Sequence, residues 1–199
     1  MNRTGRLPWL SPAELSGDAE ALYDSIARGP RASGPQHFRL TDDAGRLEGP
    51  FNAMVVAPRV GDALQSLGSA IRFSTSLSSR SREIAVLCVA VAAQSDFEWY
   101  AHEGIGRAAG LSEAALLALR HGEAWDFDEE SAVVRAIATS LAVSREIANE
   151  DYAEAERLLG STGLVELVTL VGYYLMLDLS MRAFKTPLPL GVNAPFGGV

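Results

Sequence analysis

The most apolar stretch of the chain covers residues 84 to 93 and would be hydrophobic on every face of a helix. A membrane span needs about 20 apolar residues, so a run of this length indicates a helix buried in a protein core. Three polar residues follow it, Ser95, Glu98 and His102, with the spacing i, i+3 and i+7. Residues with this spacing lie on one side of a helix. The pattern therefore predicts three polar side chains that lie on one side of a helix and face the protein core.

Elsewhere the apolar positions recur with helical periodicity, and alternation of period two persists nowhere in the chain. The sequence therefore predicts an all-α fold of about eight helices. Cap and stop signals give their bounds. The predicted helices run from Ser11 to about Arg28, over 50–56 (as a helix or a turn), from Pro58 onward, over 80–94 after a cap at Ser78 or Ser79, through Glu98 to a stop at Gly110, on to about Arg120, from about Asp126 to about Ile147, over 152–159 after a cap at Asn149, and over 163–184.

Two of these helices carry a further prediction. The helix over 80–94 is expected to be central, with the helix over 163–184 packed against it. The helix that begins at Pro58 is expected to face the core through an apolar stripe, Val60, Leu64, Leu67 and Ile71. Residues 29–49 are rich in Gly, Pro, Ser and Asp and form a long connection, which is either disordered or part of a binding site.

The charge and the cysteine content exclude several classes of function. The net charge of -8 and the scattered basic residues argue against nucleic acid as a partner. Cys88 is the only cysteine, so the chain has no internal disulfide, no thiolate metal cage and no CxxC pair. The N-terminus has too short an apolar stretch for a signal peptide, and we expect that no segment reaches membrane-spanning length. These features predict a cytoplasmic protein.

Three stretches carry a resemblance to a known family. They are Ser-Arg-Glu-Ile-Ala-Val-Leu at 81–87, Glu-Trp-Tyr-Ala-His-Glu at 98–103 and Ala-Ala-Gly-Leu-Ser-Glu at 108–113. Together with residues 46–52 and 171–174, they resemble the carboxymuconolactone decarboxylase family, which shares its all-helical fold with the alkylhydroperoxidase D (AhpD) proteins. The resemblance implies an AhpD-like helical bundle over residues 46–186, with an N-terminal helix and loop at 1–45 and an extended tail at 187–199. It also implies a homo-oligomer, a trimer or a hexamer.

The peroxidase branch of this fold uses a glutamate, a CxxC pair and a histidine. Matching its glutamate to Glu83 and its histidine to His102 puts Ser95 and Glu98 where the two cysteines would be. A peroxidatic cycle needs a thiolate and a resolving thiol, which neither residue supplies. Cys88 lies within the apolar run, where we expect a small buried hydrophobe. An alkylhydroperoxidase-like redox function is therefore disfavoured.

The lactone-decarboxylase branch implies acid/base chemistry without a cofactor, of the kind used in the catabolism of aromatic compounds. Loss of carbon dioxide from a carboxylated butenolide leaves a dienolate, which must be stabilised and then protonated on carbon. The resemblance implies that His102 donates to the oxygen or relays the proton, that Glu98 is the carbon acid and that Glu83 orients His102. The predicted substrate contacts are Pro50, Phe51, Asn52, Ser95, Trp99 and Tyr100.

Each of these residues also has a structural alternative. Glu83 can be a first-turn helix acid paired with an arginine, and Glu98 with His102 can be an exposed i, i+4 pair. Asn52 can cap a helix, and Trp99 can be a core residue. Glu98 and His102 supply only two metal ligands and no third is evident, so no metal site is predicted. A member of the fold that binds a ligand without catalysis remains a further possibility.

Overall fold

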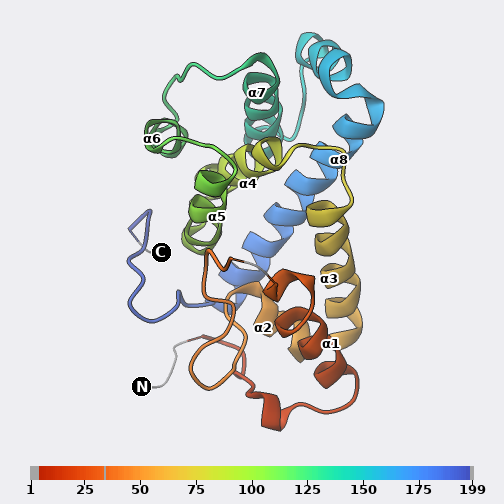
Figure 1. Cartoon of the computed structure of the whole chain (residues 1–199), viewed down its shortest axis with the longest axis vertical. Helices are drawn as coiled ribbons and strands as arrows, with labels where there is room; N and C mark the ends of the chain where they lie inside the picture. The colour runs from red at the N-terminus through yellow and green to blue at the C-terminus, as the bar shows by residue number, and fades with distance from the viewer. Residues whose placement is uncertain (1–4, 34, 198–199) are drawn as a thin grey trace.

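The structure, a computed structural model, describes residues 5–33 and 35–197. Over these residues it contains eight α-helices and two single-turn 3-10 helices, with no strand beyond one isolated antiparallel bridge between Thr41 and Leu47 (Figure 1). The prediction of an all-α fold of about eight helices is confirmed. The elements are η1 (Pro12–Glu14), α1 (Asp18–Ala27), η2 (Pro30–Ala32), α2 (Pro50–Val56), α3 (Pro58–Phe73), α4 (Ser79–Ala93), α5 (Asp96–Ala108), α6 (Glu113–His121), α7 (Glu129–Val143) and α8 (Asn149–Phe184).

Helix α4 is the centre of the fold, as the unbroken apolar run predicts. All of its residues from Glu83 to Ala90 are buried, and it packs against α5, α6, α7 and α8. Ser78 caps its first turn by accepting a hydrogen bond from the backbone N–H of Ser81. Figure 1 shows α8 crossing the molecule beside α4, which confirms the predicted packing of these two helices.

Helix α8 joins the two last predicted helices into one element of 36 residues. Gly160 marks their junction, because its φ of 66° and ψ of 169° interrupt the helical backbone there. An 18-residue window of α8 has a mean hydropathy of 1.5, so this helix is long and apolar enough by composition to cross a membrane. Our expectation that no segment reaches that length was therefore wrong. Helix α8 packs against α4 and α7, so its apolar residues are also those expected of a core helix.

Two predicted helix bounds were also wrong. Ser11 and Glu14 do form a capping box, but it closes only the single turn of η1, and α1 begins after Gly17, which has a φ of 58°. The helix predicted to reach Ile147 ends at Val143, and Arg145 beyond it has a φ of 66°. In both places a left-handed backbone conformation separates the segment from the adjoining helix.

The predicted apolar face of α3 is confirmed at Ile71, which is buried, and in part at Leu64, which packs on the core, but it is wrong at Val60 and Leu67. Val60 and Leu67 are 63% and 39% exposed, whereas the buried residues are Gly61, Gln65, Gly68 and Ile71. A Cβ at Gly61 would lie 2.2 Å from the carbonyl oxygen of Met54. The helix therefore approaches its neighbours through small residues, a packing mode that apolar periodicity does not reveal.

The segments that flank the helical core pack on it. The side-chain amide of Asn52 donates to the carbonyl oxygen of Pro8 at 2.9 Å, which holds the N-terminal segment against α2. In the C-terminal tail, the ring of Phe196 lies edge-on to Trp99, and the backbone N–H of Phe196 donates to Asp96 at 2.7 Å. The apolar tail therefore covers its own chain, with Leu190 left exposed.

Candidate active site

Glu83 and His102 meet in the interior of the molecule. Oε2 of Glu83, on α4, lies 2.7 Å from Nδ1 of His102, on α5, and both side chains are 9% exposed. A carboxylate at Nδ1 accepts a hydrogen bond from the N–H of that nitrogen and fixes the orientation of the ring. The pairing leaves Nε2 as the nitrogen that is available to a ligand.

Two tyrosines of α8 lie beside the histidine. The ring of Tyr174 stands edge-on to the imidazole with ring centroids 5.1 Å apart, and Tyr173 stands edge-on to Tyr174 at 5.4 Å. Desolvation, reinforced by the charge of Glu83, raises the pKa of Tyr174 above its ordinary value. Its hydroxyl therefore stays protonated and able to donate a hydrogen bond.

Glu98 lies one helical turn before His102 on α5 and is only 2% exposed. Both of its carboxyl oxygens are buried and make no hydrogen bond. Burial raises the pKa of Glu98 well above its ordinary value, and the nearby charge of Asp178 raises it further, whereas Arg182 lowers it. The carboxyl therefore holds its proton to a higher pH than an exposed glutamate does, which is the condition for a general acid.

Glu98 and His102 line one cavity of about 30 Å³, which is room for about two water molecules. Pro50 and Phe51 of α2 also line it, so four of the predicted site residues meet there. The remaining walls come from Arg31, Phe38, Gly68, Arg72, Phe97, Ala101, Tyr173, Tyr174 and Leu177. A lactone-sized ligand needs more room than this, so it enters only when a wall moves.

Four predicted contacts lie outside the lining of this cavity. Ser95 is the buried N-cap residue of α5 and lines a separate open groove beside Asp178 and Arg182. Asn52 binds Pro8, and the N-cap of α2 is Gly49, so the capping alternative for Asn52 is wrong. Trp99 is a core residue that packs on Phe196, as its alternative reading had it.

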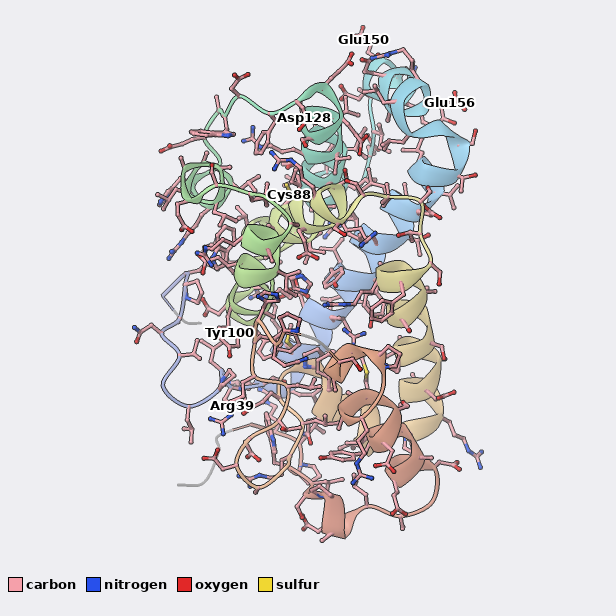
Figure 2. All side chains as sticks on the ribbon, viewed as in Figure 1. Arg39, Cys88, Tyr100, Asp128, Glu150 and Glu156 are labelled. Carbon is pink, nitrogen blue, oxygen red and sulfur yellow. The ribbon has the colours of Figure 1, made fainter. Side chains whose placement is uncertain are left out.

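Tyr100 is the fourth of these residues. Its hydroxyl accepts a hydrogen bond from the backbone N–H of Arg39 at 3.0 Å, and its ring stands edge-on to Phe97. Tyr100 therefore fastens the loop before α2 onto α5, near Arg39 (Figure 2).

Sequence reasoning missed the wall residues that come from distant segments, above all Arg31, Phe38 and Arg72. The composition of residues 29–49 gave the only signal, since it left open a role in a binding site. Arg31 and Phe38 of that connection do line the cavity, whereas Arg72 stands at the end of α3 with no motif around it.

Cys88 is buried in α4 and is not part of the cavity wall. Burial raises the pKa of its thiol to about 11, against a smaller opposing effect of a hydrogen bond with Thr139. Figure 2 shows Cys88 on α4, well above Tyr100. A thiol in this state is a poor nucleophile.

No group of three or more His, Cys, Asp or Glu side chains within residues 5–33 and 35–197 is arranged to hold a metal ion.

The fold is that of the AhpD-like proteins. An AhpD-core, peroxidase-related protein from Ralstonia eutropha JMP134 aligns with a TM-score of 0.72 and 14% identity, over 96% of this chain and 95% of that one. The debrominase Bmp8, as a cysteine-to-alanine variant in complex with 2,3,4-tribromopyrrole, aligns with a TM-score of 0.67 and 14% identity, over 88% and 86%. An AhpD-type protein of unknown function from Agrobacterium tumefaciens aligns with a TM-score of 0.63 and 15% identity, over 72% and 99%.

Residues 58–140 match the model of the Carboxymuconolactone decarboxylase family. The resemblance seen in the sequence is thereby confirmed. No curated protein sequence matches the chain.

Proposed function

We propose that this protein is a lyase that needs no cofactor and that removes carbon dioxide from a small carboxylated lactone or a related carbonyl compound. The observation that carries the proposal is the buried carboxyl of Glu98, without a hydrogen-bond partner, in the same cavity as a histidine held by Glu83. These groups provide a proton donor and a polar group for a developing oxyanion, which is what such a reaction needs.

The reaction begins when the C–C bond to the departing carboxylate breaks. Its electron pair moves through the ring alkene to the lactone carbonyl oxygen, and carbon dioxide leaves. In its imidazolium form His102 donates from Nε2 to that oxygen, while Glu83 holds Nδ1. The dienolate then takes a proton on carbon from Glu98, which regains one from solvent, so each turnover consumes one proton and releases one carbon dioxide.

A redox function fits this site less well. Thiol peroxidase chemistry needs two thiols, and the single cysteine of the chain is buried away from the cavity. We further propose that the protein acts in the cytoplasm on a small molecule, as a homo-oligomer, without a nucleic acid or a membrane as partner.

The test is a panel of carboxylated butenolides incubated with the purified protein in D₂O. We expect release of carbon dioxide together with one deuterium on carbon in the product. His102→Ala and Glu98→Gln should each lose about 10²- to 10⁴-fold in rate while staying folded, and Cys88→Ser should keep its rate. Binding of panel compounds without any turnover would instead identify a non-catalytic member of the fold.

A further inference from the structure

We propose that Arg31 and Arg72 form an anion subsite that holds a carboxylate which the substrate keeps through the reaction. The N-terminal segment, which precedes the family-matched region, would thus complete the site by supplying Arg31. The inference rests on the proposed function, because it concerns how the substrate of the same cavity is held.

Arg31 is a partly buried cation whose Nε is fully buried and without a hydrogen-bond partner. It lies in η2, and its guanidinium stacks over the ring of Phe51 at 5.1 Å. Desolvation lowers the pKa of Arg31, so its position costs stability in the empty protein. A guanidinium in this state gains most from an anion that enters the cavity.

Arg72 lies in the last turn of α3 and lines the same cavity. Its charge acts on Arg31 and is among the influences that lower the pKa of Arg31, so the two guanidiniums repel each other across the empty space. A carboxylate between them would relieve this repulsion and accept hydrogen bonds from both planar forks.

The absence of partners sets this pair apart from other arginines. Within residues 5–33 and 35–197, Arg31 and Arg72 are the two arginines without a hydrogen bond or an ion pair. The others bind carboxylates or backbone carbonyls, as Arg182 does with Asp178 at 2.7 Å. Two unpaired guanidiniums in one nearly closed cavity are therefore a local feature and not a property of the whole surface.

The chemistry decides which carboxylate the pair holds. A guanidinium stabilises a charged carboxylate more than the nearly neutral carbon dioxide that forms from it, so binding the departing group would slow the reaction. The pair therefore holds a second carboxylate, while the departing one lies toward the less polar walls.

Isothermal titration calorimetry with three probes tests the subsite. The probes are 2-furoate, its neutral isostere 2-furamide, and inorganic phosphate. The proteins are the wild type, Arg31→Met, Arg72→Met and a matched control, Arg59→Met, whose side chain on α3 is 92% exposed. We expect 2-furoate to bind the wild type and Arg59→Met with equal affinity. It should bind Arg31→Met and Arg72→Met roughly 10- to 100-fold more weakly. The neutral 2-furamide should bind the wild type as weakly as 2-furoate binds these two variants.

Thermal melts of the same variants distinguish an arginine that binds the ligand from one that only stabilises the fold. Without ligand, Arg31→Met should melt no lower than the wild type, because it removes a partly buried charge that has no ion-pair partner. A lower Tm with unchanged 2-furoate affinity would mean that Arg31 only supports the fold, and it would overturn the proposal. Phosphate that binds as tightly as 2-furoate, or a wild type that does not bind 2-furoate, would overturn the assignment to a carboxylate.

Binding of 2-furoate needs no turnover, so this proposal and the proposed function fail separately. Arginine-dependent binding without turnover of any lactone would overturn only the acid/base function. Turnover with the same KM in Arg31→Met, Arg72→Met and the wild type would overturn only the subsite.

Discussion

Nδ1 of His102 lies 2.7 Å from Oε2 of Glu83, although 19 residues separate the two in the chain. The contact joins α4 to α5 in a buried place, so the imidazole has one side fixed and the other available to a ligand. An exposed first-turn acid paired with Arg80 or Arg82, the structural alternative for Glu83, does not describe this geometry.

Replacement of Glu83 tests that contact. Glu83→Gln should reduce kcat by about 10- to 10³-fold, because an amide neither fixes the tautomer of the imidazole nor supports its charged form. Glu103→Gln is the matched control, since Glu103 lies on the same helix as His102 with a partly exposed side chain. Steady-state kinetics with circular dichroism measure both variants, and an equal loss of kcat in the two would contradict the assigned role.

The carboxyl of Glu98 should make stability depend on pH. Its pKa is raised in the folded protein above the value of 4.5 that is used for an unperturbed glutamate, chiefly by burial. The folded state therefore keeps a proton that the unfolded state has released, so stability is full below about pH 4.5 and falls as the pH rises toward the folded pKa.

Glu98→Gln should remove this dependence and be more stable than the wild type at pH 7, because a neutral amide takes the place of an ionisable buried group. Melting temperatures of both proteins between pH 4 and pH 8 measure the difference. Parallel curves for the two proteins would show that Glu98 titrates normally, and the assignment as general acid would then fail.

Cys88→Ser should keep the full rate and lose about 1–3 kcal/mol of stability, because a hydroxyl replaces a buried apolar thiol. Urea unfolding and the rate assay measure the two effects. As a control, a thiol reagent should react with the native wild type far more slowly than with the unfolded chain, given that burial raises the pKa of the thiol. If Cys88→Ser is folded but inactive while His102→Ala stays active, the acid/base mechanism is wrong and the reaction depends on the thiol.

Gly61→Ala should destabilise the protein by about 1–3 kcal/mol, since the new Cβ would lie 2.2 Å from a backbone oxygen of α2. Gly172→Ala on α8 is the control, because nothing lies within 4 Å of the Cβ there, and it should stabilise the helix by up to about 1 kcal/mol. Thermal melts compare the two variants. If Gly61→Ala is as stable as the wild type, α3 does not pack as closely on α2 as the 2.2 Å distance implies.

The homo-oligomer should form through the apolar residues that α8 exposes, Val165, Val168 and Leu179. This face, and not the apolar C-terminal tail, should carry the contact, because Phe196 and Leu188 pack on their own chain. Light scattering should give a trimer or a hexamer that Leu179→Glu weakens. Val60→Glu on α3, which is equally exposed, is the control. A monomeric wild type would contradict the prediction.

The sequence by itself determined the fold class and the central helix, and its resemblance to a family implied the contact between Glu83 and His102. An apolar run without a polar face can only be buried, so α4 follows from composition alone. The caps and glycine stops determined most helix bounds to within a few residues, as at Ser78 and at Gly110. The spacing of Glu98 and His102 on one helix places both in the cavity wall.

Only the tertiary structure decided which side chains share that cavity. Trp99 and Tyr100 adjoin Glu98 in sequence, yet each packs elsewhere because a helix turns successive side chains to different neighbours. Ser95 lies outside the helical stripe predicted for it, because it is the extended N-cap residue of α5 and lines a separate groove. Arg31 and Arg72 enter the wall from other segments, and nothing local marks them as partners. Helical periodicity reports which face is apolar, whereas the approach of α3 through Gly61 and the burial of unpaired charges depend on the segments that pack against them.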